Sequence, residues 1–315
     1  MRRREFLATL GMLPFVPYGC QPRRRAAMAL VTADTESHVA VLNAPTGRVR
    51  ARLATVEEPR SIEAAGGLRA VVAHTTSGAV SLLEGPPTRV RRVLGGMSEP
   101  RYTAVAPDGR YAYVTDSDRG EVVVIDLERG RVAGGAEVGA LARHLAIAPD
   151  GRTMWVALGS NAPAVAVVDI SEPRRPRARG LLHPPFLAHD VACSPGGRRL
   201  WVSSGDRFEL ALYAPRQPRP LAVLPAGAPP QHVSFGAGRA YVASGDDGSL
   251  QVHRIADGRL LRRTAVAKGS YNVQHGVGVV ITPSLDDGTV TIAGEDGRVI
   301  ARNRIAAAAH DACLV

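Results

Sequence analysis

A repeated motif runs along most of this chain and limits its fold more than any other feature. The clearest copy is the stretch 101–141, RYTAVAPDGRYAYVTDSDRGEVVVIDLERGRVAGGAEVGAL. It contains four short segments that suit strands, near 102–106, 111–115, 121–127 and 132–138, and Gly and Asp lie at the turns between them. Such turns allow tight hairpins, and β-branched and aromatic residues favour the strands that the turns connect. Each copy therefore predicts a four-stranded antiparallel sheet.

The copies follow one another at a nearly constant interval. Their predicted first strands begin near Ser61, Tyr102, His144, Asp190, His232, Asn272 and Asp311, so the intervals are 41, 42, 46, 42, 40 and 39 residues. A period of about 40 residues with four strands per unit is typical of a β-propeller, whose sheets pack face to face around a central channel. We therefore predict an all-β, seven-bladed propeller over residues 28–315.

The two ends of the repeat region predict how the ring closes. The propeller starts on a second strand, near 29–32, and finishes on a first strand, near 311–315. The first blade thus lacks its own first strand unless the C-terminus supplies it. We expect the C-terminal strand to complete this blade, which would leave no open edge in the ring.

Residues 1–27 are predicted to be a signal peptide and a short linker. Arg3-Arg4-Glu5-Phe6-Leu7 resembles the twin-arginine export motif, and Gly19-Cys20 resembles the end of a lipoprotein box, although Pro17 and Tyr18 depart from that box. These features predict an exported protein, located extracytoplasmically in the periplasm or at the cell surface. Cys20 is the candidate for lipidation, which would tether the chain to a membrane.

The charge does not indicate a nucleic-acid partner. The net charge of +10 comes almost wholly from arginine, because Lys268 is the one lysine, and there is no run of five like charges. Scattered arginines are typical of a solvated surface, so we expect no nucleic-acid binding. We also expect a monomer.

The second and third strands carry a recognisable signature. Tyr111-Ala112-Tyr113-Val114-Thr115 followed by Val122-Val123-Val124-Ile125-Asp126 resembles the YVTN-repeat family of seven-bladed propellers, which includes surface-layer, lactonase-like and YncE-like proteins. Related segments occur at 154–157, 200–203 and 240–243. The resemblance implies the propeller fold, and its lactonase-like members imply hydrolysis of a small cyclic ester. Propellers host many unrelated sites, so the resemblance alone does not define a function.

Three arginines define one side of the predicted channel mouth. Arg60, Arg101 and Arg143 each precede a first strand on consecutive blades. Guanidinium groups bind carboxylates and phosphates, so these residues predict a site for a small anion, although ion pairs with acidic residues of neighbouring loops are an equal alternative. The full set of candidate ligand-binding residues is Arg60, Arg101, Arg143, Gln231, Tyr271 and Asn272.

Histidines and aspartates define the other side of the mouth. The candidate metal ligands are His144, His189, His232 and His310, and the candidate catalytic residues are the pairs His189-Asp190 and His310-Asp311. Imidazole and carboxylate groups bind zinc, copper or iron, and a His-Asp pair can also orient a general base. Polar channel groups bridged by water are the alternative. The two remaining sequence features are less informative: His183 and His253 are expected on the surface, and Cys193 and Cys313 are expected to be free thiols.

Three functions remain open at this point. The first is non-catalytic binding of a small anionic molecule or a protein partner on the loop face. The second is a lactonase-like hydrolase, and the third is a metal-binding or redox protein with a transition metal as its cofactor.

Overall fold

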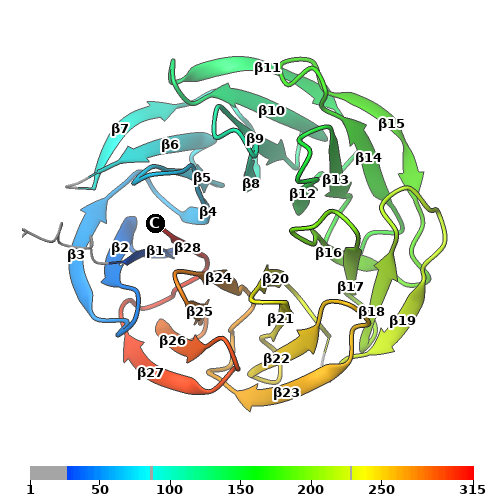
Figure 1. Cartoon of the computed structure of the whole chain (residues 1–315). Coiled ribbons are helices and arrows are strands. Elements are labelled where there is room, and N and C mark those ends of the chain that lie inside the picture. Colours follow the sequence, from blue (N-terminus) through cyan, green and yellow to red (C-terminus); the bar gives the residue numbers. More distant parts are fainter. Residues whose placement is uncertain (1–26, 86–87, 228) are drawn as a thin grey trace, which may run out of the picture.

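A computed structural model describes residues 27–85, 88–227 and 229–315. Within this part of the chain, 28 strands form seven four-stranded antiparallel sheets arranged as blades around a channel (Figure 1). The predicted seven-bladed propeller is thereby confirmed. The expected signal peptide and Cys20 lie outside the described residues.

The seven blades are numbered here in chain order, each from its innermost to its outermost strand. Blade 1 contains β28 (Ala312–Leu314), β1 (Met28–Ala33), β2 (His38–Asn43) and β3 (Val49–Ala54); blade 2 contains β4 (Pro59–Ala64), β5 (Ala70–His74), β6 (Ala79–Glu84) and β7 (Arg89–Leu94). Blade 3 contains β8 (Pro100–Val105), β9 (Tyr111–Asp116), β10 (Glu121–Asp126) and β11 (Arg131–Glu137); blade 4 contains β12 (Leu145–Ile147), β13 (Thr153–Ala157), β14 (Val165–Asp169) and β15 (Arg177–Leu182). Blade 5 contains β16 (Ala188–Cys193), β17 (Leu200–Ser204), β18 (Glu209–Tyr213) and β19 (Ala222–Pro225); blade 6 contains β20 (Val233–Gly236), β21 (Arg239–Ser244), β22 (Ser249–Arg254) and β23 (Leu260–Ala265); blade 7 contains β24 (Gln274–Gly276), β25 (Val279–Pro283), β26 (Thr289–Gly294) and β27 (Val299–Arg304).

The C-terminal strand closes the ring as the sequence predicts. β28 pairs antiparallel with β1, and Leu30 lies opposite Cys313 in this register. The backbone groups of Met28 and Val315 also exchange two hydrogen bonds, of 3.1 and 2.9 Å. The innermost strand of blade 1 therefore comes from the opposite end of the chain (Figure 1).

The core lies between neighbouring blades. Tyr113, Trp155, Trp201 and Tyr241 occupy equivalent positions on the second strands and are at most 2% exposed. Each blade is covered on both faces by its two neighbouring blades, so the second strands consist almost entirely of buried residues. Burial of these large side chains is the main stabilising contribution to the ring.

Hydroxyl groups on the second strands of three blades join each of these blades to the next one at the channel mouth. The Thr115 hydroxyl accepts a hydrogen bond from the backbone of Tyr102 in its own blade and donates one to the carbonyl of Arg143 in blade 4, at 3.1 and 2.8 Å. Thr32 and Ser203 form the same pair of bonds in their blades. These buried bonds hold the residues before and within the first strands in fixed positions.

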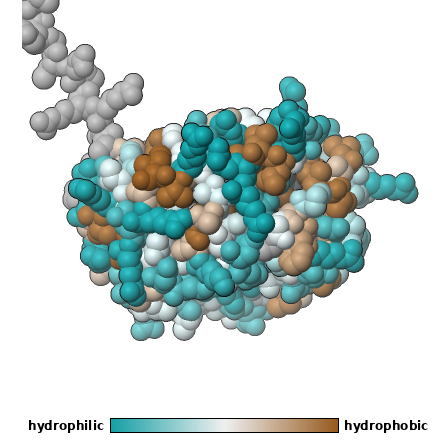
Figure 2. Space-filling model, turned by 90° about the horizontal axis from the view of Figure 1, so that it is seen from below, coloured by the Kyte–Doolittle hydropathy of each residue, from teal (hydrophilic) through white to brown (hydrophobic). Residues whose placement is uncertain are grey.

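Apolar side chains are exposed at several places on the rim of the disc. Figure 2 shows this rim with apolar patches divided by polar side chains. Exposed apolar residues on the outermost strands include Leu260 and Leu261 of β23 and Ile300 of β27. Scattered exposed apolar residues of this kind are normal for a protein surface. No helix long and apolar enough to cross a membrane occurs between residues 27 and 315, leaving out 86–87 and 228.

Candidate metal centre

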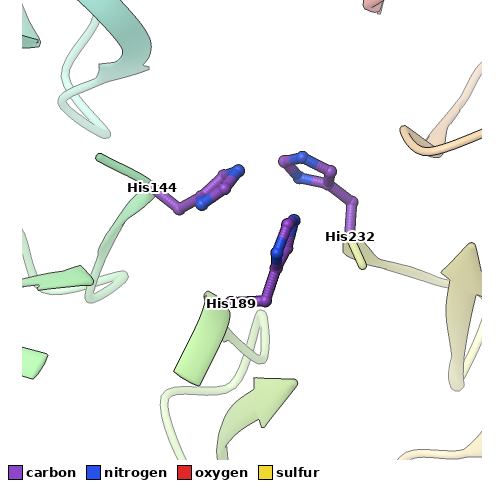
Figure 3. Close-up of side chains that lie close together, drawn as sticks. All are labelled: His144, His189 and His232. Carbon is purple, nitrogen blue, oxygen red and sulfur yellow. The ribbon is translucent and has the colours of Figure 1, made fainter. Parts of the chain in front are cut away.

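Three histidines from three consecutive blades meet at the channel mouth (Figure 3). His144 directly precedes β12, His189 lies in β16, and His232 directly precedes β20. Their possible ligand nitrogens all lie within 4.8 Å of one another, and this is the one such group of three or more ligating residues in the described chain. Nitrogens on a tetrahedral zinc ion with bonds of 2.0–2.1 Å are about 3.3 Å apart, so the three nitrogens would have to move closer together to bind one ion.

The outer nitrogens of two rings are already engaged. His189 Nδ1 lies 3.1 Å from the carbonyl of Ser160, which can only accept a hydrogen bond, so Nδ1 carries the proton. His232 Nδ1 lies 3.4 Å from an oxygen of Asp190. The Ser160 contact leaves Nε2 of His189 available to a metal, and Asp190 is placed to act as the outer partner of His232, which is the usual outer arrangement of metal-binding histidines.

The third ring has no hydrogen-bond partner. His144 is 1% exposed, and neither of its ring nitrogens is bonded to any described residue. Buried polar groups in folded proteins are nearly always satisfied, because an unsatisfied one costs about 1–3 kcal/mol. A group that binds both this ring and its neighbours would remove that cost.

The protonation states also suit a metal. Burial, followed by the neighbouring His232 and His189, lowers the pKa of His144 well below its ordinary value. Burial, followed by His232, lowers the pKa of His189 to about 4. Both rings are therefore neutral at pH 7, and neutral imidazole is the form that ligates a metal.

The local backbone explains why His189 and Asp190 both reach the mouth. Successive side chains of a regular strand point to opposite faces, but β16 has a β-bulge between Ala188 and Val191. Asp190 then accepts hydrogen bonds from the backbone N–H groups of Val191, at 2.7 Å, and of Val233 in blade 6, at 3.1 Å. The carboxylate thus fixes blade 5 to blade 6 while it faces His232.

An aromatic wall closes one side of the histidine group. The ring centroid of Tyr102 lies 3.9 Å from that of His144 and 5.5 Å from that of His232. The guanidinium of Arg143 lies 5.8 Å from the centre of the same tyrosine ring, which is within the range of a cation–π contact. Tyr102 was identified in the sequence only as the start of a first strand, and its contact with the histidines was not predicted.

A polar cavity of about 300 Å³ adjoins this group inside the ring of blades. Tyr102, His144 and His232 contribute to its wall, as do the two acidic residues Glu63 and Asp311. Burial, followed by the charge of Asp311, raises the pKa of Glu63 to about 8. The cavity thus contains a carboxyl group that is largely protonated at pH 7.

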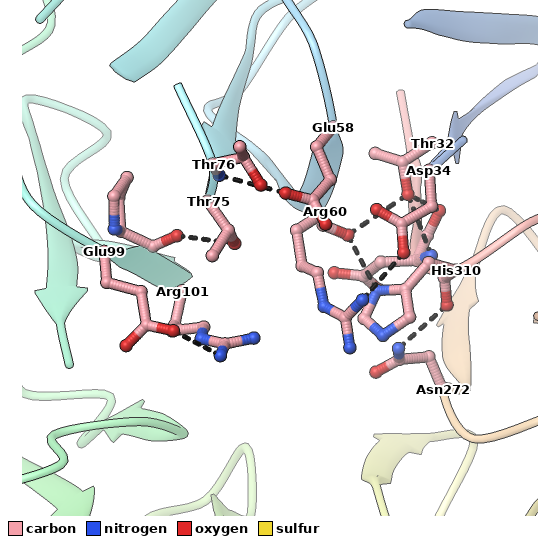
Figure 4. A network of polar contacts seen from close by, with 12 residues as sticks. Thr32, Asp34, Glu58, Arg60, Thr75, Thr76, Glu99, Arg101, Asn272 and His310 are labelled. Atoms are coloured by element: carbon pink, nitrogen blue, oxygen red, sulfur yellow. Dashed lines mark hydrogen bonds and ion pairs between the residues drawn. The ribbon is translucent and has the colours of Figure 1, made fainter. Parts of the chain in front are cut away.

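The predicted arginine arc is present, but its members differ. Arg60 forms an ion pair of 2.7 Å with Asp34, and Arg101 pairs with Glu99 (Figure 4). Arg143 has no ion pair and no side-chain hydrogen bond with any described residue. The alternative of incidental pairing therefore applies to two of the three arginines.

The remaining candidate residues do not join the histidine group. His310 Nδ1 lies 2.8 Å from the carbonyl of Arg60, and the amide of Asn272 donates to the His310 carbonyl at 2.8 Å (Figure 4). Gln231 and Tyr271 both contact Asp246. Gln231 and Tyr271 thus lie next to His232 in the chain or through its backbone, but their side chains are bonded to Asp246 and not to the histidine rings.

Neither of the expected His-Asp pairs forms a hydrogen bond within the pair. His189 instead faces Ser160, and Asp190 faces the histidine of the next blade. The carboxylate of Asp311 accepts hydrogen bonds from the backbone of Ile62 and Ala312, at 3.0 and 2.8 Å. The side chains of each pair bond to groups of neighbouring loops and blades, so adjacency in the sequence did not make these residues partners.

Two predictions about isolated residues have different outcomes. His183 is exposed, as expected, but His253 is 1% exposed, so its predicted surface location is wrong. His253 packs beside Trp201 and forms hydrogen bonds through both ring nitrogens, to Gly258 and Gln251. The expected free thiols Cys193 and Cys313 are confirmed.

No protein-family model matches this chain, and no curated protein does. Solved structures do resemble it. A functionally unknown protein from Desulfotomaculum acetoxidans has a TM-score of 0.79 at 11% sequence identity, over 91% of this chain and 98% of that one. Hydrazine synthase of Kuenenia stuttgartiensis has a TM-score of 0.65 at 18% identity, over 76% and 77% of the two chains, and apo AztD from Citrobacter koseri has a TM-score of 0.71 at 10% identity, over 92% and 98%. At these identities the similarity establishes the fold alone, namely a seven-bladed propeller.

Proposed function

We propose that this propeller binds a divalent transition-metal ion through His144, His189 and His232. The observation that supports the proposal most strongly is the convergence of three imidazole rings from consecutive blades, with the outer nitrogens of two of them engaged by Ser160 and Asp190. This combination of ligands and outer acceptors is characteristic of metal sites.

The alternative, in which the histidines are only polar groups of the channel, explains less. A histidine that serves as a channel polar group should find a hydrogen-bond partner for at least one nitrogen. His144 finds none among the described residues, although it is almost completely buried. A metal ion would satisfy this ring and its two neighbours together.

The ligand set narrows the choice of ion. Imidazole nitrogen suits zinc, copper, nickel and iron, whereas calcium and magnesium prefer oxygen. Three protein ligands leave a coordination position open, which is the arrangement of zinc sites that bind a further ligand. We therefore favour a site that binds a second molecule at the metal over a closed structural site.

Metal content measured by mass spectrometry tests this proposal. Protein purified without chelators should hold about one equivalent of zinc, copper or another such ion, and His189→Ala should lose it. His310→Ala is the matched control, because His310 is also a buried histidine of the channel mouth but lies outside the group. A stoichiometric ion that survives in His189→Ala, or a wild-type protein that takes up none when zinc is added, would refute the proposal.

The lactonase-like alternative has less support. It relied on a His-Asp pair to activate water, and neither sequence-adjacent pair has the required contact. The available pair is His232 with Asp190, in which the ring lies among the proposed metal ligands. Hydrolysis in this protein would thus depend on the metal, and loss of lactone turnover together with the ion would be its test.

We further propose that the protein is an exported member of the YVTN-like propellers. The Arg3-Arg4-Glu5-Phe6-Leu7 motif and the repeated second-strand signature support this assignment. Replacement of Arg3 and Arg4 by lysine should retain the protein in the cytoplasm. Export that is unaffected by this change would contradict the twin-arginine assignment.

A further inference from the structure

An unpaired positive charge lies beside the proposed metal site. Arg143 directly precedes His144, and its guanidinium lies over the ring of Tyr102. The ring centre of Tyr102 lies in turn 3.9 Å from that of His144. A single aromatic ring therefore lies between the guanidinium and one of the proposed ligands.

The donors of this arginine are not used by the protein. Its buried Nε has no acceptor, and the side chain forms no ion pair with any described residue. Arg143 is half-buried, and a guanidinium group that is partly removed from water is usually matched with a carboxylate, because an unmatched one loses part of its hydration without compensation. The equivalent arginines Arg60 and Arg101 have such partners, in Asp34 and Glu99.

Metal binding would increase the excess of positive charge. A divalent ion on three neutral imidazoles retains its two charges, and Arg143 adds a third. Asp190, which contacts the group, supplies one negative charge, and Asp311 in the wall of the same cavity is the other nearby aspartate, so the net charge would remain positive. An anion at the open coordination position would reduce this imbalance and use the free donors of Arg143.

We propose that the second ligand of this site is a small carboxylate, with one oxygen on the metal and the other accepting hydrogen bonds from Arg143. This inference rests on the proposed metal site. A planar two-oxygen anion matches the fork of a guanidinium group and can bridge it to a neighbouring cation. The polar cavity of about 300 Å³ is lined by His144 and His232 but not by Arg143, so it would hold the part of a small organic acid that extends away from the guanidinium group.

Cobalt-substituted protein provides a test that separates this inference from the metal site itself. Co²⁺ in the apo protein gives a visible absorption spectrum that responds to its ligands, and acetate is the probe. Acetate should change the spectrum of the wild type, and Arg143→Gln should weaken acetate binding about ten-fold or more, because a charge-assisted hydrogen bond is lost. Arg143→Lys, which retains the charge but not the fork, should have an intermediate affinity.

Arg152→Gln is the matched control, since Arg152 lies on the same blade and its side chain is exposed and makes no described contact. It should bind Co²⁺ and acetate as the wild type does. A wild-type spectrum that acetate leaves unchanged, an equal acetate affinity in Arg143→Gln, or a response to phosphate and not to acetate would overturn the carboxylate proposal while the metal site stands. Absence of Co²⁺ binding at the histidines would overturn both.

Discussion

Asp190 gives the sharpest way to separate metal binding from structure, because the chain contains a matched residue. Asp190 accepts hydrogen bonds from Val191 and from Val233 of the next blade, and Asp311 accepts the same two kinds of bond, from Ala312 and Ile62. Both carboxylates therefore join neighbouring blades. Only Asp190 also forms a close contact with a proposed metal ligand, at 3.4 Å from His232 Nδ1.

The expected effects follow from these contacts. Asp190→Asn and Asp311→Asn each replace one accepting oxygen by an amide group, so each should lower the free energy of unfolding of the apo protein by about 1–3 kcal/mol. Asp190→Asn should in addition weaken metal binding by about 10–100-fold, which is about 1.4–2.8 kcal/mol, since it removes the outer partner of a ligand. Asp311→Asn should leave metal affinity within about three-fold of the wild type.

Denaturant unfolding of the apo proteins measures the first effect, and competition of Zn²⁺ with a chromophoric chelator measures the second. Comparable losses of stability with a selective loss of metal affinity in Asp190→Asn would support the account. Equal metal affinities in the two variants would refute the assignment of Asp190 as the outer partner of a ligand.

Three further predictions concern stability. Deletion of His310–Val315 removes the strand that closes blade 1 and should lower the free energy of unfolding by several kcal/mol. This is a large part of the about 5–15 kcal/mol by which a typical domain is stable. An unchanged melting temperature would contradict the closure of the ring by this strand. The pKa of His189 is lowered from 6.5 in the unfolded chain to about 4 in the folded apo protein. The unfolded chain therefore binds a proton at this residue at a higher pH than the folded protein does, and the free energy of unfolding should fall as the pH drops from 6.5 towards 4. His189→Gln should weaken that pH dependence. The pKa of Glu63 is raised from 4.5 to about 8 in the folded protein, so ionisation of this residue should lower the free energy of unfolding as the pH rises through that range. At about pH 8, Glu63→Gln should therefore be more stable than the wild type. Equal unfolding curves of the two proteins at that pH would exclude this effect.

The fold could be predicted from the sequence because its main determinants are local and repeated. Tight turns such as Pro107-Asp108-Gly109 recur at a fixed interval, and Gly109 adopts the left-handed conformation, with φ of 67°, that this turn requires. The order of strands at the two ends was sufficient to predict the pairing of β28 with β1. Both features depend on sequence period rather than on side-chain geometry.

The site could be predicted only in part. The period placed His144, His189 and His232 at one level of the ring, but it could not distinguish them from His310, which stands at an equivalent position. Whether a histidine joins the group depends on which blades are neighbours and on the orientation of its imidazole ring. His144, His189 and His232 come from consecutive blades, whereas His310 is directed to the backbone of Arg60.

The outer partners were not predictable from the repeat. Ser160 contributes a backbone carbonyl, which has no signature in side-chain chemistry. Asp190 was expected to act with the adjacent His189, but a β-bulge and the blade interface bring it to His232 instead. Distances between blades decide such contacts, and the sequence interval does not encode them.

X-ray absorption spectroscopy at the metal edge is the most direct test of the central claim. Zinc-loaded protein should show three imidazole nitrogens at about 2.0–2.1 Å with the outer-shell scattering of histidine rings, plus one further oxygen or nitrogen ligand. The number of imidazoles should fall in His144→Ala and remain unchanged in His310→Ala. A zinc ion bound by sulfur or by fewer than three imidazoles in the wild type would contradict a trihistidine centre at the mouth of this propeller.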